Sequence, residues 1–201
     1  MRNALTTLAN GASGIVRVIG DLAAWTGLAL VLLVAFNVLA RYFFSYGTVA
    51  LQEAEWHLMA VAALFGMAYG LNRGGEVRVD ILYAKMRPRV QAVVDLIASV
   101  LLVAISLIIT WLSLDYVEAS FSISEGSPDP GGLGNRYLLK AVIPVAFAVL
   151  AVQAFAMTLQ AICAVVWPNA GPGAEAPSST HGARSDQPTP AHGGDTPQTK
   201  L

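Results

Sequence analysis

The sequence predicts an all-α integral membrane protein with four membrane-spanning helices, a short interfacial helix on the cytoplasmic side and a disordered C-terminal tail. Charged residues make up only 12% of the 201 residues, against about 25% in a typical soluble domain. The hydrophobic share is 55% and the mean hydropathy is +0.58. Four long apolar stretches carry this hydrophobicity, which is more than the core of a soluble domain of this length would enclose.

Each predicted span is long enough for a membrane, because about 20 helical residues cross a hydrocarbon core of about 30 Å. The four spans are residues 20–43, 51–72, 91–115 and 138–167. The first and third contain Leu22–Ala40 and Leu96–Leu114, which approach or reach that length without a charged residue. The second and fourth reach it once their polar flanks are counted. We therefore expect one transmembrane domain over residues 1–167.

The positive charges predict the orientation, because Lys and Arg are enriched in short cytoplasmic loops. Nine of the 12 Lys and Arg residues fall on one side of the predicted spans: Arg2, Arg17, Arg73, Arg78, Lys85, Arg87, Arg89, Arg184 and Lys200. The opposite side holds only Arg41, Arg136 and Lys140. Both termini are therefore expected in the cytoplasm. The tail, residues 168–201, is rich in Pro, Gly, Ser and Thr and is expected to be disordered.

The segment Glu76–Met86, between the second and third spans, is too short and too charged to cross a bilayer. An apolar stripe at helical spacing is formed by Val79, Leu82 and Met86. The charged residues of the segment include Arg78, Asp80 and Lys85. This pattern predicts an amphipathic helix on the cytoplasmic membrane surface, ended by Pro88. The alternative is an ordinary basic loop.

Polar residues at the predicted outer face are candidates for contact with a partner. Glu53 and Glu55 lie at the start of the second span, where helix ends favour negative charge. They are either solvated helix ends, or they dock a partner or pair with Arg41. On the same side, the Gly- and Pro-rich run from Ser127 through Asp129 to Gly132 predicts a turn-rich loop.

Inside the predicted spans, Gly66 and Gly70 form a Gly-x-x-x-Gly face that allows close approach of another helix. That helix belongs either to this chain or to a partner. Gln153 and Gln160 are more consistent with hydrogen bonds to a neighbouring helix than with ligand contact. His57 is a lone histidine near the membrane surface, which favours an interfacial role over metal or haem ligation.

Several short runs, in this order, resemble those of a known family. They are Arg41-Tyr42, Glu53-Ala-Glu55-Trp56, Phe65-Gly66, the run from Asn72 to Asp80, Ser127-Pro-Asp-Pro-Gly-Gly132, Lys140-Ala-Val-Ile-Pro144 and Leu150-Ala-Val-Gln153. Together they are similar to the small membrane subunit, the Q-type permease component, of TRAP (tripartite ATP-independent periplasmic) transporters. The resemblance covers about residues 20–165.

The resemblance implies a scaffold in the bacterial inner membrane. It would support a large elevator-type subunit and help to dock a periplasmic substrate-binding protein during organic-acid uptake coupled to sodium. In keeping with this role, the span centres carry no ionisable residue and no broken helix pair of the kind that marks a transport site. The partner-interface candidates are Arg41, Glu53, Glu55, Gly66, Gly70, Ser127 and Asp129.

Other classes of membrane protein fit the residues less well. A haem-bearing anchor needs two histidines within the helices, and only His57 qualifies. The chain shows no HExxH and no Gly-x-Ser-x-Gly motif, so an enzyme is not indicated. An autonomous exporter would use a membrane-embedded acid, for which Asp95 is a weak candidate. A four-helix adaptor or anchor of another membrane complex remains the alternative. No cofactor is predicted.

Overall fold

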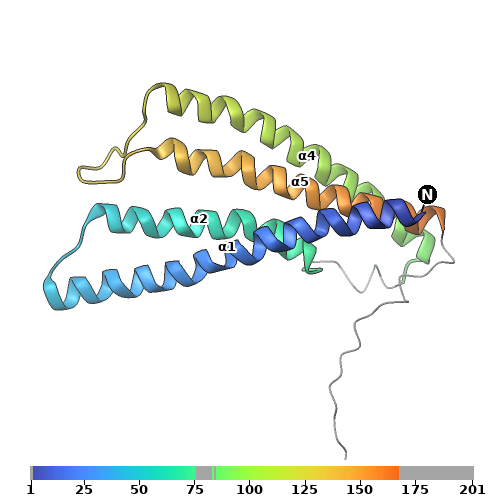
Figure 1. Ribbon diagram of the computed structural model, residues 1–201, viewed down its shortest axis with the longest axis horizontal. Helices are drawn as coiled ribbons and strands as arrows, with labels where there is room; N and C mark the ends of the chain where they lie inside the picture. The colour runs from blue at the N-terminus through green and yellow to red at the C-terminus, as the bar shows by residue number, and fades with distance from the viewer. Residues whose placement is uncertain (1, 76–82, 84, 168–201) are drawn as a thin grey trace, which may run out of the picture. The chain divides into compact units, whose positions relative to one another are not determined.

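The computed structural model describes residues 2–75, 83 and 85–167, and every long regular element within them is an α-helix. The helices are α1 (Arg2–Phe44), α2 (Val49–Asn72), α4 (Pro88–Ser122) and α5 (Arg136–Val166). The helices α1 and α2 form one hairpin and α4 and α5 another (Figure 1). The all-α prediction is confirmed. The predicted tail lies outside the described residues.

Three of the described helices, α1, α4 and α5, are long and apolar enough to cross a membrane. The helix α2 has 24 residues and a length of about 36 Å, but it does not meet the same criterion of composition. Polar residues such as Glu53 and Asn72 near its two ends lower its mean hydropathy. That α2 also crosses the membrane stays a prediction; the structure shows that α2 packs beside α1 and α5.

The helix α1 starts well before the predicted first span, because residues 2–19 continue the same helix. This extension has a buried stripe at helical spacing. Ala9 packs with Ala156 and Leu159 of α5, and Val16 packs with Ala68 of α2 and Leu150 of α5. Contact with two other helices explains why residues of low charge and modest hydrophobicity are helical here, although the sequence predicted a helix only from residue 20.

The helix α5 is the centre of the bundle, because it contacts each of the other three helices. Its buried residues are mostly small, and they include Ala146, Ala151, Ala154 and Ala161. Pro144 is also buried within α5. Small side chains let neighbouring helix backbones approach closely, which is the usual basis of helix association in lipid.

A row of four serines on α4 forms the seam with α5. Ser99, Ser106, Ser113 and Ser120 are all buried and follow one another at intervals of seven residues. Residues seven apart lie on one face of a helix, as in the left-handed packing of coiled coils. The hydroxyl groups of Ser106 and Ser113 donate to carbonyl oxygens one turn earlier in α4. Their polarity is thus satisfied within the helix, and the seam packs as a row of small residues.

The helices α1 and α2 are in close contact at Gly20. A Cβ atom placed there would lie 2.1 to 2.8 Å from three atoms of the Tyr69 side chain, so only glycine fits. The Tyr69 hydroxyl donates to the carboxylate of Asp21 (2.9 Å) and accepts from Arg73 (2.8 Å). This contact fixes the crossing of α1 over α2 close to the end of α2.

Candidate partner interface at the loop end

Glu53 is the organising residue of the end where the α1–α2 and α4–α5 connections lie. Its side chain is buried, with 4% of the residue exposed. One carboxylate oxygen accepts from the Ser127 hydroxyl (2.5 Å), and the other accepts from the backbone N–H of Leu133 (2.6 Å). Glu53 thus fastens the first turns of α2 to the α4–α5 loop. It is not the solvated helix end that one interpretation of the sequence expected.

The loop that Glu53 holds is folded on itself. The N–H of Ser127 donates to the carbonyl of Leu133 (3.1 Å), and the N–H of Gly132 donates to that of Asp129 (3.0 Å). A Cβ atom on Gly132 would meet both Ser127 and the Glu53 carboxylate within 2.8 Å, so the close approach requires glycine. Asp129 is exposed, which leaves its carboxylate at the surface of this loop.

A second carboxylate, Glu125, joins the end of α4 to the start of α5. It accepts from the Ser120 hydroxyl (2.6 Å) and from the Lys140 ammonium. The Lys140 ammonium also lies 4.2 Å from the centre of the Tyr116 ring. The contacts with Lys140, and then with Ser120, hold the pKa of Glu125 below its ordinary value. Sequence reasoning did not single out Glu125 as a functional residue. The signal that could have found it is an acid at one end of a turn-rich loop and Lys140, 15 residues later, at the other end, where the two can form an ion pair.

Aromatic and cationic side chains adjoin the two carboxylates. The Arg136 guanidinium lies 5.3 Å from the centre of the Trp56 ring, which packs in turn against the His57 imidazole. The Nδ1 atom of His57 donates to the carbonyl of Glu53 (2.6 Å). The His57 imidazole is therefore hydrogen-bonded one turn after Glu53 begins the attachment to the α4–α5 loop. Among the described residues, no group of three or more His, Cys, Asp or Glu side chains is arranged to hold a metal ion.

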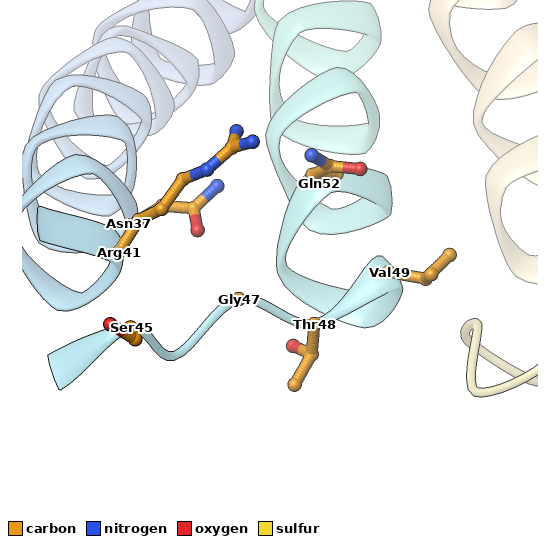
Figure 2. A pocket seen from close by; sticks show the side chains of 7 residues that line it. All are labelled: Asn37, Arg41, Ser45, Gly47, Thr48, Val49 and Gln52. Atoms are coloured by element: carbon orange, nitrogen blue, oxygen red, sulfur yellow. The ribbon is translucent and has the colours of Figure 1, made fainter.

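Glu55 bonds to a residue other than the cation that one sequence interpretation suggested. Its Oε1 atom accepts from Nδ2 of Asn37 on α1 (2.8 Å). Arg41, one turn further along α1, instead lines a pocket of about 490 Å³ between the end of α1 and the start of α2. Figure 2 shows Asn37 and Arg41 on α1 and Gln52 on α2 around this space. The structure thus pairs Glu55 with Asn37 and not with Arg41.

The Gly66–Gly70 face is not used for packing within the described chain. Gly66 is exposed, and a Cβ atom on either glycine would meet nothing within 4 Å. Internal packing at these glycines, one of the two expectations, is therefore wrong because the neighbouring helices cross α2 elsewhere. Contact with a partner remains a prediction.

Two expectations concern the opposite end. Gln153 is buried, and its Oε1 atom accepts from Asn72 of α2 (2.9 Å), which confirms hydrogen bonding to a neighbouring helix. Gln160 is exposed. The predicted interfacial helix falls mostly outside the described residues, Arg78 and Asp80 included. Lys85 is exposed, and the nearby Tyr83 donates to the carboxylate of Asp95 (2.7 Å).

Comparison with known proteins agrees with this architecture. The family model described as "Tripartite ATP-independent periplasmic transporters, DctQ component" matches residues 30–164. A curated relative, the C4-dicarboxylate TRAP transporter small permease protein DctQ of Pseudomonas aeruginosa, is 28% identical over 109 residues. The match covers 51% of this chain and 52% of the relative, so the chain spans about half the length of the curated protein that it matches. No solved structure matches.

Proposed function

We propose that this chain, which belongs to the DctQ component family of tripartite ATP-independent periplasmic transporters, serves as the scaffold that holds a large membrane subunit. The family is a transporter component and not an enzyme. Membership and the apolar helices together indicate a multi-pass protein of the inner membrane.

The observation that carries the scaffold function is how the polar side chains of the helices are engaged. Glu53, Asn72 and Gln153 are bonded to other elements of this same chain. A transport pathway would instead present such groups to a cavity near the bilayer centre. Here they join α2 to its neighbours, and this supports a rigid body rather than a moving one.

The outward faces of α1 and α4 supply the surface that a scaffold needs. Large apolar residues are more than half exposed on both helices, among them Leu32 and Phe36 on α1 and Ile108, Trp111 and Leu112 on α4. In a bilayer, apolar side chains gain no hydrophobic free energy when a partner helix replaces acyl chains, so association on such a face depends on close packing. The open Gly66–Gly70 face of α2 is the best site for that packing, and we assign it to the large subunit.

We place the loop end on the periplasmic side of the membrane and both termini in the cytoplasm, with α2 as the remaining span. The distribution of Lys and Arg supports this orientation. The loop held by Glu53, with Asp129 exposed on it, then faces the periplasm and offers a docking surface for a substrate-binding protein. Electrostatic contacts of this kind weaken as the salt concentration rises.

For the transported molecule we propose an organic acid, with uptake coupled to sodium. The relative from Pseudomonas aeruginosa is named for C4-dicarboxylates. The chain itself supports no finer choice, because the proposed scaffold does not contact the substrate. The second candidate is an adaptor or anchor of another membrane complex, which the same exposed apolar faces of α1 and α4 would also serve.

Reconstitution tests the scaffold function directly. Liposomes with a sodium gradient receive the small subunit alone, the large subunit alone, or both, each with the binding protein outside. Uptake of radiolabelled C4-dicarboxylates and 2-oxo acids is then measured. We expect uptake only where both membrane subunits are present. Uptake by the small subunit alone, or equal uptake without it, would refute the scaffold function.

A further inference from the structure

We propose that the pocket between the end of α1 and the start of α2 binds the phosphate group of a membrane phospholipid. Arg41 is the one charged residue among the seven that line this space, and its side chain is exposed. A guanidinium group presents a planar fork of N–H donors that matches two phosphate oxygens at once. The pocket therefore carries a positive charge on the side where Arg41 lies (Figure 2).

Among the described residues, no salt bridge joins Arg41 to an acid. The Glu55 carboxylate accepts from Asn37, and Glu55 does not line the pocket. Asn37 precedes Arg41 by four residues, so the two share a face of α1. Glu55 is hydrogen-bonded to Asn37 and not to Arg41, so the guanidinium is available for an anion.

Two further groups from α2 adjoin the same space. Thr48 and Val49, at the start of α2, are part of the lining, so the positive end of the α2 dipole borders the pocket. Gln52 lines it one turn later and supplies an amide N–H₂ group from the side opposite Arg41. Donors from two helices and the helix end converge on one small volume.

The position of the pocket along α1 selects a lipid as the source of the phosphate. The aromatic residues around the end of α1 are strongly exposed: Tyr42, Phe43, Phe44 and Tyr46. Such residues mark the headgroup level at the ends of membrane spans, and α1 is one of the candidate spans. Exposed Val34 and Val38 precede Asn37 and Arg41 by three residues and provide an apolar track for an acyl chain on the same face.

The test measures lipid retention by the full-length protein in detergent. Native mass spectrometry, with increasing dioleoylphosphatidylglycerol, gives the apparent Kd of the first bound lipid. Loss of the bidentate contact in Arg41→Gln is expected to weaken binding about tenfold or more. Arg41→Lys keeps the charge but not the planar fork of N–H donors, and its apparent Kd is expected to lie between those of wild type and Arg41→Gln. The matched control is Arg136→Gln, which removes the same charge at the same end, and it is expected to bind within about twofold of wild type.

A second pair of variants keeps the test independent of any folding defect at Arg41. Gly47 lines the pocket, and a Cβ atom there would meet nothing within 4 Å. We expect Gly47→Glu to weaken lipid binding through repulsion of the phosphate, whereas Gly47→Gln, with the same shape, does not. Equal losses in Arg41→Gln and Arg136→Gln would overturn the proposal in favour of general charge attraction. Competition by inorganic phosphate at the concentration of the lipid would overturn the assignment to a lipid.

Discussion

Removal of the Glu53 carboxylate is expected to release the α4–α5 loop while the helices stay in place. In Glu53→Ala, the Ser127 hydroxyl and the Leu133 N–H both lose their acceptor. The loop retains its own bond between Ser127 and Leu133, so it loosens at its attachment to α2 rather than unfolding completely. The carboxylate joins the loop to α2 through two bonds, and both are lost together.

The magnitude follows from the Leu133 amide. A hydrogen bond to a charged group is stronger than a bond between neutral groups, and the amide exchanges its proton only when this bond opens. We expect the exchange protection of Leu133 to fall about tenfold or more in Glu53→Ala. Glu53→Gln keeps one acceptor oxygen and is expected to lose less.

Hydrogen–deuterium exchange of the purified protein, read by mass spectrometry over residues 123–135, measures this change. The matched control is Glu55→Ala, the same substitution two residues later in α2, because Glu55 bonds to Asn37 rather than to the loop. Unchanged protection of Leu133 in Glu53→Ala, or an equal loss in the control, would show that Glu53 does not hold the loop. If the loop docks the binding protein, uptake by the full transporter should fall with the protection.

Three further outcomes are expected. The pKa of Glu125 is lowered chiefly by Lys140, so the ionised carboxylate stabilises the fold above the ordinary pKa of 4.5, and this contribution is lost as the pH falls through the lower folded value. Below pH 4.5 the melting temperature should therefore drop further in wild type than in Glu125→Gln. Parallel curves of melting temperature against pH for the two proteins would exclude the effect. Gly66→Leu should insert and fold normally but co-purify less with the large subunit, since space is open at Gly66; undiminished co-purification would place that contact elsewhere. In a cysteine-free background, Gly134→Cys should react with an impermeant thiol reagent in intact cells and Gly11→Cys should not, because both positions are open and the charge count puts them on opposite sides of the membrane; the reverse labelling would invert the topology.

The sequence predicted the helices well because their apolar runs are long. It did not predict the extension of α1 back to Arg2. Residues 2–19 are helical through contact with α5, which begins at residue 136, and no local pattern reports a partner so distant in the chain. The seven-residue spacing of the four serines on α4 is present in the sequence. Membrane spans are recognised by their apolar residues, so this spacing was not used to predict the contact with α5.

The candidate interface shows a similar division. Residue type and position singled out Glu53 and Ser127 as partner-interface candidates, which stays a prediction, but they did not predict the contact between these two residues, which lie 74 positions apart. For Gly66 and Gly70, the motif indicates close packing without naming the partner, and the chain leaves that face open. Propensity and periodicity are local, whereas the bonds that hold the loop depend on how the two hairpins pack.

The packing of the N-terminal part of α1 constrains the order in which this protein is assembled during synthesis. Ala9 contacts Ala156 and Leu159, so this part of α1, which is synthesised long before α5, cannot complete its packing until nearly the whole bundle has been translated. Contacts of such long sequence separation close late. Until then the early segment presents Ala9, Val16 and Gly20 without α5, and nascent chains cut short before α5 are expected to be substrates for membrane quality control. Packing of the N-terminal part of α1 against α5 can therefore occur only after α5 has been translated.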